Sequence, residues 1–272
     1  GLGCWAVSCR AQQGSRARRC TFVSIGTGPA ARYERYALIF DPDRSRLGEE
    51  ALALVERGID PLYAGDPDEA HLLALQETGR VGALIVPGTL PLSVLDALID
   101  RISPQLWAGR AAVVVVDPPA DRALLRALRD RDLSWLLREP YDAAEFRFVV
   151  AAALATDDKL DPRSGLRVPI SMPVVVTIDG DRRDGFVRNV SIGGAYVALE
   201  APPDAGASIR LALDLGERPL DVNASVAYRQ ATGAAGRAVR ESGMGVAFRG
   251  LEEAERVAIA DFIGERIRSF RL

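Results

Sequence analysis

Hydrophobic positions between Tyr36 and Ala155 form short apolar runs that alternate with amphipathic stretches. Short apolar runs predict buried strands, and apolar residues recurring every three or four positions predict helices. Five strands are expected, at Tyr36–Phe40, Pro61–Ala64, Gly82–Val86, Ala111–Val116 and Trp135–Leu137. Five helices are expected, at Arg46–Arg57, Pro67–Thr78, Leu92–Ile102, Ala120–Arg131 and Ala143–Ala155. Regular alternation of this kind predicts an open, doubly wound α/β domain whose parallel sheet has helices on both faces.

The hydrophobic period changes to two after residue 167, and turn residues then separate short alternating segments. Six strands are expected, at Val168–Ile178, Asp184–Val190, Gly194–Leu199, Ser208–Leu215, Asp221–Arg229 and Gly243–Phe248. Short strands at regular spacing are typical of a small antiparallel barrel or sandwich. The chain then continues with an amphipathic helix at Leu251–Phe270, whose apolar stripe is suited to cover the sheet.

These patterns predict two domains, at residues 33–155 and 168–272, joined by a linker at 156–167. The linker begins with the polar segment TDDKLDP, which ends in proline. Residues 1–32 contain five arginines and no acidic residue, and we expect a disordered or loosely docked tail. Whether this tail belongs to the native protein stays open. The sequence contains no apolar run long enough for a transmembrane helix, so a cytoplasmic protein without membrane insertion is expected.

Composition excludes several kinds of chemistry. The formal net charge of -3 gives no general attraction to DNA or to a membrane surface. His71 is the single histidine, and the three cysteines all lie within the first twenty residues. We therefore expect no catalytic residue and no metal site. Of the 34 basic residues only Lys159 is lysine, so an arginine in this sequence is weaker evidence of anion binding than usual.

Two short motifs mark the start of the second domain. Arg163–Arg167 (RSGLR) places two arginines four positions apart, and Asn189–Gly194 (NVSIGG) follows about twenty residues later. Order and spacing resemble the PilZ family, whose signature is RxxxR followed by [D/N]xSxxG. The segment Gly243–Phe248 (GMGVAF) resembles a late strand of the same family. The first motif is common by chance at this arginine content, whereas the second is rare. The resemblance covers Arg163–Arg268 and implies a six-stranded antiparallel β-barrel with a C-terminal helix.

Members of the PilZ family of this kind bind cyclic di-GMP, which the resemblance implies as the ligand here. Guanidinium groups pair bidentately with phosphate or with the O6/N7 edge of guanine. Arg163 and Arg167 are expected to clamp the ligand from the linker. Asn189 is expected to contact a base or orient an arginine, and Ser191 to supply a hydroxyl. Gly194 is expected to allow a close approach of the backbone to the ligand.

A structural interpretation stays open beside each of these roles. The two arginines could be solvated linker charges, and Asn189 and Ser191 could shape a turn through side-chain-to-backbone bonds. Gly193 and Gly194 could serve turn geometry alone. Pro162 stands where many relatives carry a further basic residue. The resemblance therefore favours one bound ligand, or a weaker ligand dimer, over an intercalated ligand dimer.

The first domain resembles a response-regulator receiver domain. Asp41 and Asp43 match the acidic positions after the first strand, but Ala83–Pro87 (ALIVP) places no aspartate at the phosphoacceptor position. Asp117 occupies the approximate place of the hydroxyl residue, and Glu139 replaces the usual lysine before proline. Without an acceptor carboxylate there is nothing to phosphorylate. A pseudo-receiver used for protein contact is therefore expected, with Asp41 and Asp43 as turn or helix-cap residues.

Three functions are weighed on these observations. The leading hypothesis is a non-enzymatic bacterial effector in which cyclic di-GMP orders the linker, reorients the domains and alters the surface for an unidentified protein partner. The alternative is an adaptor that binds protein and no nucleotide, and homodimerisation stays open in either case. An enzyme such as a phosphodiesterase or phosphatase needs clustered acids, histidine or metal ligands, which the second domain lacks. The partner and the output, whether motility, polysaccharide secretion or transcription, are not determined by the sequence.

Overall fold

The computed structural model describes residues 35–43, 47–55, 59–107, 111–131, 135–155, 165–216, 219–231, 233–235 and 238–272. The predicted tail at 1–32 and most of the predicted linker, including Arg163, lie outside these residues. Two compact units make up the chain, Gly1–Ala111 and Ala112–Leu272. The predicted domain limits of 33–155, 156–167 and 168–272 stay a prediction.

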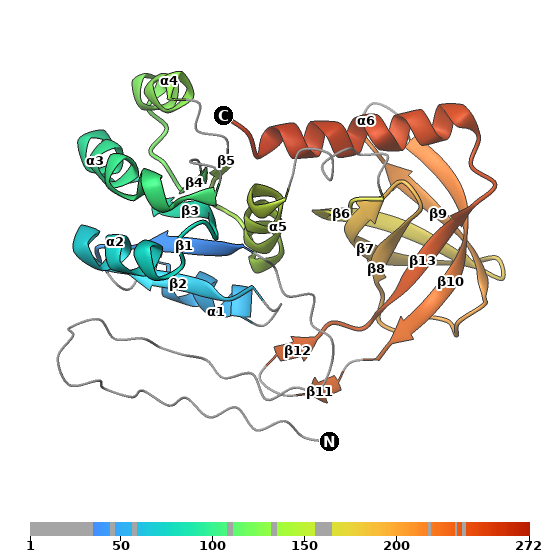
Figure 1. Cartoon of the computed structure of the whole chain (residues 1–272). Helices are drawn as coiled ribbons and strands as arrows, with labels where there is room; N and C mark the ends of the chain where they lie inside the picture. The colour runs from blue at the N-terminus through green and yellow to red at the C-terminus, as the bar shows by residue number, and fades with distance from the viewer. Residues whose placement is uncertain are drawn as a thin grey trace. The chain divides into compact units, whose positions relative to one another are not determined.

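Alternating strands and helices form the α/β part of the chain (Figure 1). The strands are β1 (Tyr36–Phe40), β2 (Pro61–Ala64), β3 (Val81–Pro87), β4 (Ala112–Val116) and β5 (Trp135–Leu137). The helices are α1 (Gly48–Val55), α2 (Pro67–Gln76), α3 (Leu92–Ile102), α4 (Arg122–Asp130) and α5 (Ala143–Leu154), with a short 3-10 helix, η1, at Ser103–Gln105. The predicted α/β class is confirmed.

The five-stranded sheet has the order β2-β1-β3-β4-β5. Strand β1 pairs in parallel with β2 and β3, and β4 pairs in parallel with β5. This strand order is that of flavodoxin-like folds, which include receiver domains, and it identifies a fold without identifying a function. Every residue of the central strand β3 is buried, as expected where helices cover both faces of a parallel sheet.

The second part of the chain is a closed barrel of six strands in the order β10-β13-β8-β7-β6-β9 (Figure 1). Its strands are β6 (Val168–Ile178), β7 (Asp181–Ser191), β8 (Gly194–Ala198), β9 (Ser208–Asp214), β10 (Pro219–Gln230) and β13 (Gly243–Arg249). Every pairing in it is antiparallel. The predicted barrel is therefore confirmed. A short hairpin of β11 (Gly233–Ala235) and β12 (Ala238–Arg240), which the sequence did not predict, lies between β10 and β13.

Alternation along the strands produces the barrel core. In β9, residues Ile209, Leu211 and Leu213 are buried while the residues between them are exposed. The final helix α6 (Glu253–Ser269) buries Ile259, Ile263 and Ile267, which recur every four residues on one face. This helix contacts β6, which begins directly after Arg167, and β7, which carries Asn189 and Ser191.

Among the described residues, no helix has the length and apolar character needed to cross a membrane.

Candidate functional site

The two motifs of the barrel meet at the start of β6. Arg167 lies just before β6, its side chain is exposed, and Nη1 donates a hydrogen bond of 3.2 Å to Oδ1 of Asn189 on β7. Strand pairing brings the two residues together, because Pro169 is the partner of Asn189 across β6 and β7. A guanidinium group has five N–H donors, so this one bond leaves others directed to the surface. Asn189 is thus placed to orient an arginine, one of the two roles considered for it.

A β-bulge in β7 explains why Asn189 faces outward. The β7–β8 register shifts between Val187 and Asn189, and the residue between them, Arg188, is only half-buried. A bulge sets two residues of one strand against one residue of its partner and re-aims their side chains. Arg188 and Asn189 both remain accessible as a result, while Val187 and Val190 on either side are buried in the core.

Ser191 and Gly194 close the hairpin between β7 and β8. They are cross-strand partners, and the buried Ser191 hydroxyl donates a bond of 3.1 Å to the Gly194 carbonyl. A Cβ at Gly194 would lie 2.1 Å from the carbonyl oxygen of Val246 on β13. Both residues therefore have a structural role in the barrel. Contact of either residue with a ligand stays a prediction.

An ion pair joins Arg188 in the bulge to Glu241, which lies two positions before β13. Nε and Nη2 of Arg188 donate to the two carboxylate oxygens of Glu241 at 2.9 and 2.6 Å, and Nη1 donates to Ser171 Oγ at 2.8 Å. The hydrogen bond from Arg188 lowers the pKa of the Glu241 carboxyl, and the same bond raises the pKa of Arg188. Because both side chains are substantially exposed, we expect the pair to fix geometry more than to add stability.

Two tyrosines beside the motifs were not predicted as site residues. The Asn189 backbone pairs with Tyr196 on β8, Tyr196 pairs with Gly245 on β13, and Gly245 pairs with Tyr228 on β10. The Tyr196 and Tyr228 rings have centroids 6.5 Å apart with planes inclined by 27°. Burial raises the pKa of Tyr196, whose hydroxyl donates to the Glu241 carbonyl at 2.9 Å. The two glycines of the GMG segment (Gly243 and Gly245) could have predicted aromatic neighbours, because a glycine on a strand often accommodates an aromatic ring from the neighbouring strand.

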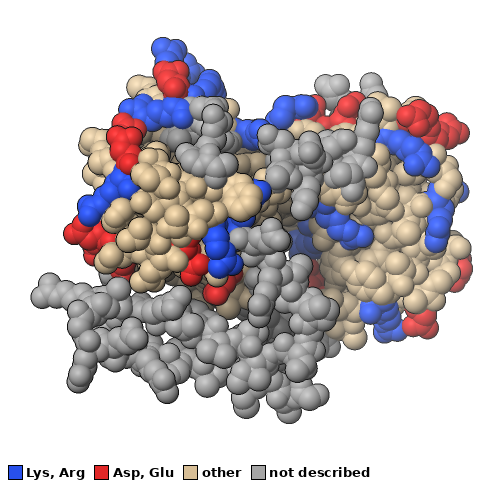
Figure 2. Space-filling view, viewed as in Figure 1, with Lys and Arg blue, Asp and Glu red and all other residues tan. Residues whose placement is uncertain are grey.

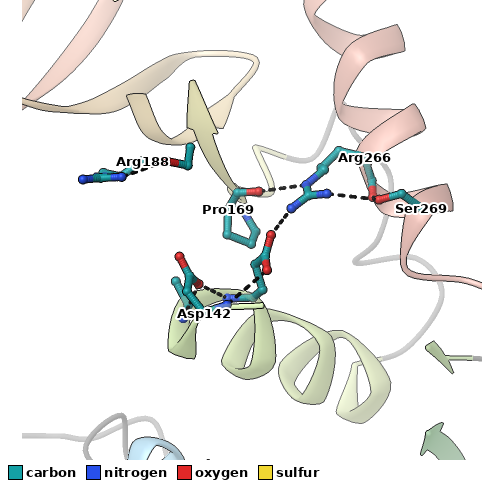
Figure 3. A network of polar contacts seen from close by, with 8 residues as sticks. Asp142, Pro169, Arg188, Arg266 and Ser269 are labelled. Carbon is teal, nitrogen blue, oxygen red and sulfur yellow. Dashed lines mark hydrogen bonds and ion pairs between the residues drawn. The ribbon is translucent and has the colours of Figure 1, made fainter. Parts of the chain in front are cut away.

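A second polar network links β6 to helices α5 and α6, all within the unit Ala112–Leu272 (Figure 3). Arg266 on α6 donates from Nε to the carbonyl of Pro169 at 3.1 Å and from Nη2 to Glu145 on α5. Glu145 also accepts from the amide of Asp142, whose carboxylate caps the first turn of α5. Pro169 is the strand partner of Asn189, so this network reaches the strand position where the two motifs meet.

The carboxylates resembling those of a receiver site have structural partners. Asp41 is fully buried, and its Oδ2 accepts from the amide of Leu47 at 3.0 Å and from the hydroxyl of Tyr63 at 2.6 Å. These two bonds tie Asp41 to the residue before α1 and to β2, which agrees with a structural role for this carboxylate. Asp43 is exposed in a turn. Strand β3 ends in Val86 and Pro87, so no carboxylate stands at its end.

Within the residues that the structure describes, no group of three or more His, Cys, Asp or Glu side chains is arranged to hold a metal ion. Acidic and basic side chains are interspersed over the face seen in Figure 2, without one continuous basic area.

Residues 161–265 match the model of the PilZ domain family. These residues form a PilZ domain. The match includes the barrel, both motifs and most of α6, and it confirms the resemblance found in the sequence. The PilZ domain is about two fifths of the chain, so the α/β part lies outside the family match and its likeness to receiver domains is one of fold.

No curated protein matches the sequence. Among solved structures, the inhibitor of motility MotI/DgrA of Bacillus subtilis is 17% identical, with a TM-score of 0.34, over 39% of this chain and 52% of that one. PlzA of Borreliella burgdorferi, solved in complex with c-di-GMP, is 15% identical, with a TM-score of 0.28, over 46% of this chain and 50% of that one. A putative diacylglycerol kinase of Bacillus anthracis is 12% identical, with a TM-score of 0.25, over 78% of this chain and 93% of that one. The chain thus spans about half the length of MotI/DgrA and of PlzA.

Proposed function

We propose that the chain is a non-enzymatic effector whose PilZ domain binds cyclic di-GMP and transmits binding to a protein partner. The observation that carries the proposal is the hydrogen bond between Arg167 and Asn189, which joins the two family motifs on the barrel surface. Arg167 is exposed and oriented, and a bidentate contact from arginine is the commonest way in which proteins recognise the O6/N7 edge of guanine. Arg163 is proposed to supply a second guanidinium from the linker, opposite the ligand phosphates.

The test is calorimetric titration of the full chain with cyclic di-GMP. Saturable binding is expected for the wild type, with a large loss of affinity in Arg167→Ala and in Arg163→Ala. Arg182→Ala is the matched control, because Arg182 is an exposed arginine on β7, seven residues from Asn189 and roughly 23 Å along the strand. Absence of binding by the wild type, or equal losses in Arg167→Ala and Arg182→Ala, would contradict the proposal. The measured stoichiometry decides between one ligand and a ligand dimer.

Ligand binding is proposed to be coupled to partner binding through the contacts that Arg266 makes with Pro169 and Glu145. Docking of the linker around the ligand displaces or tightens β6 near Pro169, and the carbonyl of Pro169 is held by Arg266 together with Glu145 on α5. Such coupling requires the ligand to bind one arrangement better than another. Hydrogen exchange of the full chain with and without cyclic di-GMP tests it. Changed protection is expected at the start of α5 and the end of α6, and unchanged protection there in the saturated complex would refute the coupling.

The alternative function is a nucleotide-independent adaptor. Three leucines on α1 and α2, all in the first unit, are about half exposed: Leu52 at 54%, Leu72 at 47% and Leu75 at 52%. In this alternative, these leucines are proposed to supply part of the protein contact. This alternative predicts that Arg167→Ala leaves partner binding unchanged and that Leu72→Glu weakens it. Ligand control through the PilZ domain predicts instead that Arg167→Ala changes partner binding.

A further inference from the structure

A row of outward-facing positions crosses four strands of the barrel next to Arg167. It runs from Asn189 on β7 through Tyr196 on β8 and Gly245 on β13 to Tyr228 on β10, each residue being the direct strand partner of the next. Directly opposed residues of antiparallel strands share a face. The flanking residues Ala195 and Val197 are buried in the core, so Tyr196 lies on the outer face with Asn189.

The missing side chain of Gly245 lets the two tyrosine rings approach each other over β13. A Cβ at Gly245 would lie 2.1 Å from Cε1 of Tyr228, so the Tyr228 ring occupies the space above the glycine. A bulge directly precedes Tyr228, because the register between β10 and β13 shifts between Val226 and Tyr228 and leaves Ala227 as the extra residue. As in β7, the irregularity sits beside the proposed site and sets the direction of a surface side chain.

Polar contacts of Glu241 hold the Tyr196 ring in place. The carbonyl of Glu241 accepts from the Tyr196 hydroxyl at 2.9 Å and from Nε2 of Gln230 at 3.2 Å, and its carboxylate is held by Arg188. Tyr228, by contrast, leaves 47% of its surface in solvent. One ring is therefore held rigidly and the other is an exposed aromatic surface beside it, at the edge of a site that already carries an arginine and an amide.

We propose that Tyr196 and Tyr228 form a platform on which one guanine base of cyclic di-GMP stacks, while Arg167 and Asn189 hold the ligand at the neighbouring strand. The inference rests on the proposed function and adds the residues that bind a base face. Stacking on aromatic side chains is worth about 1–3 kcal/mol per base, equivalent to roughly a 5- to 150-fold change in the dissociation constant. Because every base has a π-face, the platform contributes affinity, whereas Arg167 contributes the choice of guanine.

Titration calorimetry of the full chain with cyclic di-GMP provides the first test. Tyr228→Ala is expected to raise the dissociation constant by about 5-fold or more, and Tyr228→Phe to keep it within about 2-fold of wild type, since a phenyl ring also stacks. Trp107→Ala is the matched control, because Trp107 is also an exposed aromatic residue but lies in the first unit, outside the barrel. Gly245→Ala retains both tyrosines but displaces the Tyr228 ring, and it is expected to weaken binding as Tyr228→Ala does.

A measurement on the wild-type protein keeps the test independent of any folding defect. The chain has six tyrosines, so ring signals of protein labelled with ¹³C at the tyrosine ring are few, and Tyr228→Phe assigns one of them. Saturation with cyclic di-GMP is expected to move the Tyr228 ring signals upfield, as stacking under a purine requires. If the wild type binds and Arg167→Ala weakens binding, but Tyr228 shows no upfield shift and Tyr228→Ala binds like wild type, the platform is refuted and the proposed function stands. If the wild type does not bind, both fail.

Discussion

Gly194 begins β8 directly against the backbone of β13. A Cβ at this position would lie 2.1 Å from the Val246 carbonyl oxygen, 3.2 Å from the Val246 carbonyl carbon and 3.3 Å from Cα of Ala247. All three atoms belong to the backbone, so no side chain can rotate away to relieve the clash. Ordinary contact begins at 3.4 Å, and β8 and β13 would therefore have to separate by more than 1 Å where they pair. Overpacking of this kind costs about 1–3 kcal/mol, and Gly194→Ala is expected at the upper end of that range.

Gly193 provides a matched control one residue away. A Cβ at Gly193 meets nothing within 4 Å. Replacing a glycine with alanine also reduces the entropy of the unfolded chain, which favours folding by about 0.4–1 kcal/mol where the backbone tolerates alanine. Gly193→Ala is therefore expected to be neutral or slightly stabilising. A difference of about 3 kcal/mol between two adjacent and chemically identical substitutions is the expected result.

Urea unfolding of the full chain without ligand, followed by circular dichroism, measures this difference. Because the chain has two compact units, hydrogen exchange of β8 and β13 peptides is needed to assign the loss to the barrel. Equal stability of Gly194→Ala and Gly193→Ala would refute the packing argument. If Gly194→Ala kept wild-type stability but lost cyclic di-GMP binding, the glycine would serve the ligand rather than the strand pairing.

Ser191, Glu241 and Arg266 each carry one further expectation. Ser191→Ala removes the buried bond to the Gly194 carbonyl and is expected to cost about 1 kcal/mol in urea unfolding, with no loss refuting a structural role for the hydroxyl. The folded-state pKa of Glu241 is lowered by Arg188, so its contribution is present above the ordinary glutamate pKa and is lost as pH falls through the folded value. The melting temperatures of wild type and Glu241→Gln should thus differ at pH 7, by an amount that reflects less than about 1 kcal/mol, and converge as the pH falls through the folded pKa of Glu241. A gap that stays constant as the pH falls would contradict this. Arg266→Ala leaves the mostly buried Glu145 carboxylate without its cation, and faster hydrogen exchange at the start of α5 is expected, whereas unchanged exchange would exclude a holding role.

Local pattern predicted the elements whose apolar residues recur at regular spacing from one end to the other. Strands β1, β2, β5 and β6 and helix α3 begin and end at the predicted residues. Strand β7 begins at Asp181, three residues before the predicted start, because its first residues are all exposed and carry no hydrophobic signal. Backbone pairing with residues 175–178 of β6 extends the strand there, and such pairing is a property of the hairpin that side-chain alternation does not record.

The candidate site was predictable only as far as the motif extends. Arg167 and Asn189 were found because a family signature includes them, and the structure adds the hydrogen bond between them. Tyr196 and Tyr228 lie thirty-two positions apart, and they meet because β13 pairs with both β8 and β10. The β10–β13 pair contains a bulge, which shifts by one residue the set of side chains that shares a face. Without knowledge of which strands pair and in what register, the sequence could not predict that the two rings are neighbours.

The [D/N]xSxxG motif combines two kinds of constraint in this chain. Ser191 and Gly194 act within the barrel, through a buried hydroxyl bond and a backbone contact that excludes any side chain. Asn189 faces the surface because of the bulge and contacts Arg167. This barrel therefore uses the serine and the glycine in its own packing, whereas packing places no such demand on an exposed arginine. Their presence is evidence for the fold, and Arg167 with Asn189 is the evidence for a ligand. For that reason the decisive variants for function are those of Arg167 and Tyr228, and those of Ser191 and Gly194 report first on folding.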